Sequence, residues 1–272
     1  VYKPMYARVR VCDAVESSRP DYCFRYPAGN YKPVGQVQLK SDGTRISAFG
    51  YLADNSARYG GVLRAPMGYV GPTMPNASGV MVPNPRAEWN VNTGVFVDNP
   101  LNEAGFNYSG TVNYLNRFGT TGTKGYYKGL DPVGELYYES LRYYMGLGPT
   151  PEATAGMTAA MTDGYPVYTT WQDPILNACH RKNYTLVIGD VNTHWDKQLP
   201  GHGGAGSVAT DANDPARGAE NLLGSGTFNA VTWAKVIADL ETDASNTFTN
   251  SLGAVVSTAG NPNPIAANAS LN

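Results

Sequence analysis

The sequence predicts an α/β fold from two strand patterns and one amphipathic helix. Residues 45–52 are typical of a sheet strand, and the aromatic and β-branched run YTLVI at 184–188 stops at Gly189. Residues 131–145 carry apolar side chains at helical spacing, so this segment is expected to cover the sheet as a helix. At 272 residues the chain is long enough for one large domain or two small ones.

The helix predicted at 131–145 has clear start and stop signals. Asp131 is an N-cap residue followed by Pro132 at the first helical position, and Glu135 lies near the positive end of the helix dipole. Glycines and prolines between 146 and 151 end the helix. Its expected buried face consists of Val133, Leu136, Tyr137, Ser140, Leu141 and Tyr144.

Between residues 53 and 107 the composition changes to Gly, Pro, Asn and single hydrophobes without a persistent helical period. This segment is predicted to be a large insertion of loops and β-hairpins with packing of its own. Shorter helices are predicted at 33–39, at 228–240 and at 110–118, where Val112, Leu115 and Phe118 share one face. Residues 1–250 are interpreted as the folded region, and residues 251–272, rich in Ser, Asn, Ala and Pro, as a linker.

The strand predicted at 184–188 runs into a polar loop that contains Asp190, Asn192, Thr193, His194 and Asp196. In open α/β sheets ligands bind beyond the carboxyl ends of the strands. A carboxylate such as Asp190 in that position can hold Mg²⁺ or Ca²⁺, because these hard cations prefer oxygen ligands. The same residue types also cap helices and close turns without any ligand. Both interpretations of the loop stay open.

Composition and charge exclude some functional classes. Charged residues make up only 15% of the chain, below the roughly 25% of typical soluble domains, while Gly 31, Pro 19 and Tyr 19 make it loop-rich and aromatic. This balance favours an exported surface protein. The net charge of −2 and the absence of a basic run disfavour a nucleic-acid partner. The sequence has no apolar run long enough to span a bilayer, and its start without Met or a signal peptide indicates a mature form or a fragment.

The three cysteines suggest one disulfide and one remaining thiol. Cys12 and Cys23 are separated by a short loop that a disulfide could close in an oxidising compartment. Cys179 is then either a buried free thiol or a residue whose partner lies outside this chain. A cysteine-ligated zinc site is not expected, since no second close-spaced pair of Cys or His is present.

Several motifs, in their order along the chain, resemble the PilC/PilY family of type IV pilus biogenesis and tip-adhesin proteins. They are the pair Cys12 and Cys23, YKP (31–33), GGVLR (60–64), PRAEW (85–89), DPVGELYYE (131–139), GYPV (164–167), WQDPI (171–175) and IGDVNT (188–193). The resemblance covers most of residues 1–250, and the order of the motifs is more specific than any single one.

The resemblance implies an exported Gram-negative protein of the periplasm, outer membrane or cell surface and pilus tip. It implies a von Willebrand factor A-like (Rossmann-like) sheet with covering helices, in the N-terminal part of a polypeptide that ends in a β-propeller. Pilins and minor pilins of the type IV pilus, and host or abiotic surface ligands, are the partners it implies. The function it implies is pilus assembly and surface attachment without catalysis.

A-domain metal sites combine an Asp-x-Ser-x-Ser loop, a Thr from a second loop and an Asp after a later strand. The resemblance places Asp190 at the last of these, with Mg or Ca as the expected ion. The Asp-x-Ser-x-Ser loop is absent from this sequence. Either residues preceding Val1 complete the site, or this member has no functional one.

An alternative is a metal-dependent phosphoesterase. The run LVIGDVNT at 186–193 resembles the Gly-Asp-x-Asn strand end of the endonuclease/exonuclease/phosphatase family, in which Asp190 and Asn192 would arrange metal and phosphate. That family also needs an upstream Glu and a late Ser-Asp-His, and no Ser-Asp-His occurs here.

Overall fold

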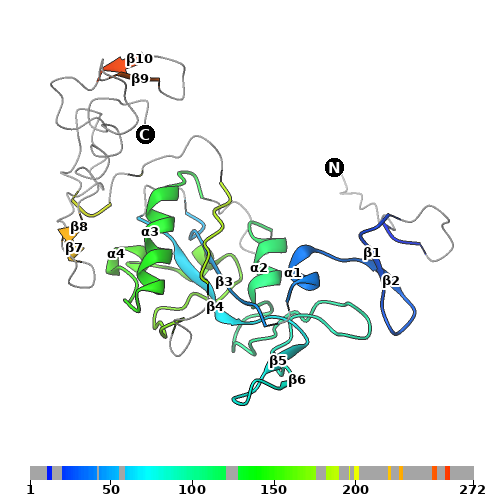
Figure 1. Ribbon diagram of the computed structural model, residues 1–272. Helices are drawn as coiled ribbons and strands as arrows, with labels where there is room; N and C mark the ends of the chain where they lie inside the picture. The colour runs from blue at the N-terminus through cyan, green and yellow to red at the C-terminus, as the bar shows by residue number, and fades with distance from the viewer. Residues whose placement is uncertain are drawn as a thin grey trace, which may run out of the picture. The chain divides into compact units, whose positions relative to one another are not determined.

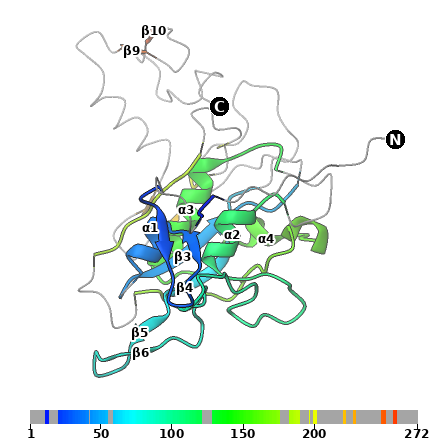
Figure 2. The ribbon, with the colours of Figure 1, turned by 90° about the vertical axis from the view of Figure 1, so that its right-hand side faces the viewer.

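The computed structural model describes residues 11–13, 20–41, 43–54, 59–120, 128–175, 182–189, 196 and 199–201, together with four short strands between 220 and 257. The chain divides into two compact units. The first contains Val1–Ala48 and Ala65–Phe118, and the second contains Phe49–Arg64 and Gly119–Asn272. Figures 1 and 2 show the elements from two directions.

The described elements mix short helices with short strands. The helices are α1 (Gln36–Leu39), α2 (Thr111–Arg117), α3 (Val133–Tyr144), α4 (Pro151–Thr154) and the 3-10 helix η1 (Ala159–Thr162). The strands are β1 (Cys23–Arg25), β2 (Tyr31–Pro33), β3 (Arg45–Gly50), β4 (Val62–Tyr69), β5 (Thr73–Pro75), β6 (Met81–Pro83), β7 (Glu220–Asn221), β8 (Thr227–Phe228), β9 (Thr247–Thr249) and β10 (Val255–Ser257). They pair as β1–β2, β3–β4, β5–β6, β7–β8 and β9–β10.

The first unit is built around an apolar cluster of Val70, Trp89 and Val112. Helix α2 brings Val112 to this cluster, and α1 and β3 bring Val37 and Ile46 to its edge. The β1–β2 hairpin is fixed by the loop that follows Trp89. The side-chain amide of Asn30 donates to the carbonyl of Thr93 at 2.7 Å, and the amide of Ala28 donates to the carbonyl of Asn92 at 2.9 Å.

The second unit is built around Leu52, Tyr59, Val62 and Ala153, with methionines 157 and 161 and Val167 packed against them. The Arg64 side chain is fully buried and donates to the carbonyls of Thr162 and Tyr51. A guanidinium costs a large desolvation free energy when buried, so these hydrogen bonds are a condition for placing Arg64 there. The rings of Phe49, Tyr143 and Trp171 contact one another with centroids 5.5 to 5.7 Å apart.

The mixed α/β character and three of the predicted elements are confirmed. Strand β3 lies within the run predicted at 45–52, α2 within 110–118, and α3 within 131–145. All sheets formed by described residues have two strands, so the predicted von Willebrand factor A-like sheet is not seen among them. Helix α1 is a single turn that begins at Gln36, because Pro33 belongs to β2.

The helix faces predicted from apolar spacing are only partly right: Val112 of α2 and Ser140 of α3 are buried as predicted, and the other predicted residues are not. In α2 the buried residues are Thr111, Val112, Asn113 and Tyr114, while Leu115 and Phe118 are 43% and 60% exposed. In α3 the buried residues are Glu135, Tyr138, Glu139, Ser140 and Tyr143, while Tyr137 is exposed. The apolar pattern failed because these helices bury polar groups that have hydrogen-bond partners on distant segments.

The prediction of a buried strand at 184–188 is also wrong. Residues 182–189 form no strand pairing with other described residues, and they are exposed. β-propensity reflects how well a side chain packs against neighbouring strands. It does not show whether such strands are present beside a given segment.

The predicted segment 53–107 contains the β5–β6 hairpin as well as β4, which contributes the buried residues Val62, Leu63 and Ala65. Its role as an insertion stays a prediction. The linker at 251–272 also stays a prediction; it contains β10, which pairs with β9 just before it. The helix predicted at 228–240 lies outside the described residues, except for Phe228 at the end of β8.

Gly94 provides a test of the packing in the first unit. It has a φ of +66°, and a Cβ at this position would lie 2.2 Å from the buried Tyr26 ring. We expect Gly94→Ala to lower the free energy of unfolding by about 2 to 4 kcal/mol, because the left-handed backbone and the ring clash add.

Gly79→Ala is the matched control, because Gly79 has a φ of +78° with nothing within 4 Å of its Cβ position. We expect a cost of about 1 kcal/mol there, from the backbone alone. Urea unfolding of the two variants measures the difference, and equal costs would contradict the packing described around Tyr26.

Candidate functional site

The polar loop predicted to bind a ligand is flanked by two described residues that contact the first turn of α3. Gly189 lies against Val133, since a Cβ on Gly189 would be 3.4 Å from Cγ2 of that side chain. The carboxylate of Asp196 accepts hydrogen bonds from the amides of Gly134 at 2.9 Å and Glu135 at 3.0 Å. Asp190 and Asn192 themselves lie outside the described residues.

Asp196 acts as the N-terminal cap of α3 from outside the helix. The first amides of a helix have no partner within it, and the residue preceding α3, Pro132, makes no side-chain cap bond. The N-cap position of α3 is therefore Pro132 and not Asp131 as predicted. For Asp196, the structural interpretation of the loop's polar residues is confirmed: both carboxylate oxygens are bonded to helix amides, where the helix dipole also favours negative charge.

Two fully buried carboxylates lie one turn apart on the inner face of α3. Glu135 accepts a hydrogen bond from the amide of Gly60 at 2.7 Å. Glu139 accepts one from the hydroxyl of Thr150 at 2.7 Å and one from the amide of the same residue at 3.2 Å. Through these bonds α3 is joined to the segment before β4 and to the start of α4. Burial raises the pKa of Glu139, while the Thr150 hydrogen bonds and the charge of Arg142 act in the opposite direction.

Two glycines allow the chain before β4 to approach α3 closely. Gly60 has a φ of +61°, and a Cβ there would lie 3.2 Å from Cγ of Glu139. A Cβ on Gly61 would lie 2.0 Å from Cδ1 of Leu136. The GGVLR motif at 60–64 and the DPVGELYYE motif at 131–139 therefore form one contact, in which the small residues of one receive the large residues of the other.

A third buried carboxylate, Glu88, caps helix α2 in the first unit, as Asp196 caps α3 in the second. Glu88 accepts hydrogen bonds from the amides of Thr111 at 2.9 Å and Val112 at 2.6 Å, at the start of α2. The N-cap residue of α2 is Gly110, with a φ of +86° and no side chain to offer. Burial raises the pKa of Glu88 to about 7, although both amide hydrogen bonds act to lower it.

Hydrophobicity patterns missed these carboxylates because they assign Glu to solvent. One sequence signal could have found them. Glu88 lies within the PRAEW motif, and Glu135 and Glu139 lie within DPVGELYYE, so all three belong to the motifs that carry the family resemblance. Each accepts hydrogen bonds from backbone amides, and an ionised carboxylate is a strong acceptor for such bonds.

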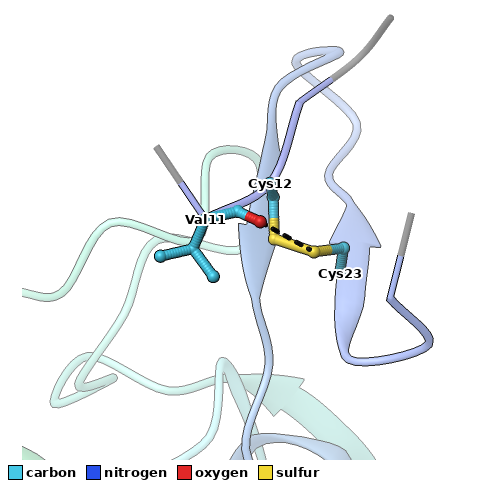
Figure 3. The surroundings of a disulfide bond; sticks show 3 residues. All are labelled: Val11, Cys12 and Cys23. Carbon is cyan, nitrogen blue, oxygen red and sulfur yellow. Dashed lines mark hydrogen bonds between the residues drawn. A yellow bond between two sulfur atoms is a disulfide. The ribbon is translucent and has the colours of Figure 1, made fainter. Parts of the chain in front are cut away.

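The disulfide between Cys12 and Cys23 is present, with a Cα–Cα distance of 5.7 Å (Figure 3). It joins residue 12 to the first residue of β1, and so ties the preceding chain to the β1–β2 hairpin. The carbonyl oxygen of Val11 lies 3.8 Å from Sγ of Cys23. This is a contact and not a hydrogen bond, because a disulfide sulfur carries no hydrogen. Cys179 lies outside the described residues.

The described residues do not by themselves form a metal centre. No three His, Cys, Asp or Glu side chains among them gather closely enough to hold an ion. None of the helices in this part of the chain has the length and apolar character needed to cross a bilayer.

The chain matches a family model described as PilY1 homolog, second domain, over residues 51–267. This match covers most of the sequence, so the chain belongs to the PilY1 homolog family, and the family resemblance of the motifs is confirmed. A protein of Xylella fastidiosa (strain Temecula1 / ATCC 700964), named type IV pilus biogenesis factor PilY1 homolog, is 42% identical over 212 residues. The alignment covers 72% of this chain and 17% of that relative. No solved structure matches the chain.

Removal of the Asp196 carboxylate tests the distant cap on α3. We expect Asp196→Ala to lower the free energy of unfolding by about 1 to 2 kcal/mol, because two helix amides lose their acceptor. Asp131→Ala, at the position that the sequence alone favours as the cap, is expected to cost less. Chemical denaturation followed by circular dichroism measures both, and a larger loss for Asp131→Ala would contradict the assignment.

Glu88 should make the stability of the first unit depend on pH. Its folded pKa of about 7 lies above that of an exposed glutamate, so the folded state holds more protons than the unfolded state between roughly pH 4.5 and 7. The free energy of unfolding therefore decreases as pH rises through this window, by at most about 3 kcal/mol.

Glu88→Gln keeps one acceptor oxygen and removes the titration, so its unfolding free energy should change less between pH 5 and 7.5. Glu152→Gln, at an exposed carboxyl in α4, is the control and should retain the wild-type slope. Denaturation midpoints measured across this pH range test the prediction. If the unfolding free energy of Glu88→Gln depends on pH as steeply as that of the wild type, the prediction is wrong.

Proposed function

We propose that this chain is a non-catalytic part of a type IV pilus tip-associated protein that contributes to pilus assembly and surface attachment. The observation that carries the proposal is the match to the second domain of PilY1 homologs over residues 51–267. The name of the Xylella relative, a type IV pilus biogenesis factor, supports the assembly role. Because the alignment covers 17% of that relative, the activity of the whole protein is itself part of the proposal.

The chemistry of the described residues supports a structural and binding role. The buried carboxylates of Glu88, Glu135 and Glu139 and the partly buried carboxylate of Asp196 all accept hydrogen bonds from backbone amides, so they hold helices in place. Within the segment 53–107, the side chains of Val80, Val91 and Val95 are each half exposed or more. We propose that this segment faces the surface ligand, because irregular segments on a rigid scaffold commonly carry recognition.

The finer parts of the proposal follow the family resemblance. We propose that the region completes a von Willebrand factor A-like fold in a longer exported polypeptide with a C-terminal β-propeller. Pilins and minor pilins are its assembly partners, and host or abiotic surfaces supply its ligands. Asp190 is proposed to hold Mg²⁺ or Ca²⁺. Asp196 is not available to complete that site, since both of its oxygens are bonded to helix amides.

Location is the first test of this function. An antibody raised against this chain and coupled to gold should label the ends of sheared pili from the producing bacterium. Label along the whole filament, or antigen found only in the periplasm or medium, would contradict the tip assignment.

An Asp190→Ala substitution separates the tip protein from a phosphoesterase that uses Asp190 and Asn192. We expect the variant to keep its pili but to lose cation-dependent attachment, with no phosphatase turnover in either protein. Glu152→Ala, which removes an exposed carboxylate in α4 outside the segment 53–107, is the control and should attach normally. Phosphatase activity that is abolished only in Asp190→Ala would replace the proposal with the enzymatic one.

A further inference from the structure

The side chains of Asp54 and Lys128 form a buried ion pair in the second unit. Nζ of Lys128 donates to Oδ1 of Asp54 at 3.3 Å, although the two residues are 74 positions apart in sequence. The Asp54 side chain is 6% exposed and the Lys128 side chain is 10% exposed. Removing two opposite charges from water costs free energy that their attraction need not recover. The pair is therefore a candidate for chemistry that removes both charges.

The backbone holds these two side chains beside each other. The amide of Gly129, the residue after Lys128, donates to the carbonyl of Asp54 at 3.0 Å. The amide of Ala53 donates to the carbonyl of Met161 at 2.8 Å, so the residue before Asp54 is fixed as well. A nucleophile and an electrophile that are held together in this way react as if each were at a very high concentration.

Apolar and aromatic groups adjoin the pair. Leu52, two residues before Asp54, is 2% exposed and belongs to the apolar cluster of the second unit. The centroid of the Tyr51 ring lies 5.9 Å from Nζ of Lys128. Exclusion of water favours a neutral product over two charges, and it protects that product from hydrolysis.

We propose that this pair is a site of covalent modification, at which the side chains of Lys128 and Asp54 condense to an intramolecular isopeptide bond. Nζ of Lys128 first gives one proton to Oδ1 of Asp54 along the hydrogen bond that joins them. The neutral amine then attacks Cγ of Asp54, so that an N–C bond forms and a C–O bond breaks. The departing hydroxyl takes a second proton from Nζ and leaves as water. The product is an uncharged amide that keeps one N–H, and the condensation needs no other reactant.

The bond closes a ring around a part of the chain that belongs to the first unit. The chain leaves the second unit after Arg64 and returns to it at Gly119. Positions 54 and 128 lie outside both crossings, so a bond between them encloses residues 65–118 completely. A cross-link that closes a long loop restricts the unfolded chain and thereby stabilises the folded one. This inference depends neither on family membership nor on the pilus-tip role.

Mass spectrometry of the mature protein, purified from the producing bacterium, tests the bond directly. Trypsin does not cut after an amidated lysine, so residues 46–58 should be recovered joined to residues 125–142. The mass of the joined peptides should be lower by one water than the sum of the two, and fragmentation should place the link between Asp54 and Lys128. Recovery of residues 46–58 and 129–142 as separate peptides of unmodified mass would overturn the proposal.

Lys128→Arg separates the covalent bond from the ion pair, because a guanidinium keeps the positive charge but stays protonated and does not attack a carboxyl group. With the disulfide reduced, the denatured wild-type protein should migrate ahead of this variant in electrophoresis, since a closed ring is more compact than an open chain. Lys40→Arg, at an exposed lysine of the first unit, is the control and should migrate as the wild type does. If the wild type and Lys128→Arg migrate equally, the residues form an ion pair alone and the proposal is wrong.

Discussion

The second unit depends on the two carboxylates that α3 buries. An unpaired charge in a protein interior is strongly destabilising, so Glu135 and Glu139 are compatible with the fold only because Gly60 and Thr150 donate to them. Each such donor, if left without its acceptor, would cost about 1 to 3 kcal/mol. The position of α3 is therefore specified by directional bonds, which fix the rotation of the helix more narrowly than apolar contacts can. The close approach of Gly60 and Gly61 to the helix follows from the same requirement.

Local sequence was sufficient to locate helices α2 and α3 but not to identify their buried faces. The existence of α3 follows from residues adjacent to it, namely Pro132 at its start and the glycines and prolines after it. Its buried face does not, because the groups that make burial of Glu135 and Glu139 possible lie 75 and 11 residues away in sequence. A hydrophobicity pattern contains no information about such partners. Strand β4 was only partly visible for a related reason: it contains Arg64, Pro66 and Gly68, and its burial depends on contacts with distant segments such as Thr162.

The candidate site divides in the same way. The Cys12–Cys23 disulfide was accessible from spacing, since one short loop limits the geometry. At the polar loop that follows Gly189, the sequence identified the polar residues but not whether they bind a ligand or cap a helix. The carboxylate of Asp196 proved to be bonded to helix amides. No residue chemistry in this chain specifies a pilus. That information came from the order of whole motifs, and the structure explains why the order is informative: GGVLR contacts DPVGELYYE, and PRAEW caps α2. Motifs that contact one another constrain one another's sequence.

Caps supplied from distant segments also link secondary structure to tertiary structure. Helix α2 has seven residues, too few to persist alone in water, and neither α2 nor α3 begins with a side-chain cap of its own. The carboxylates that complete them, Glu88 and Asp196, come from segments 23 or more residues away in sequence. Helix and scaffold must therefore form together, and neither unit can be assembled from independently stable helices.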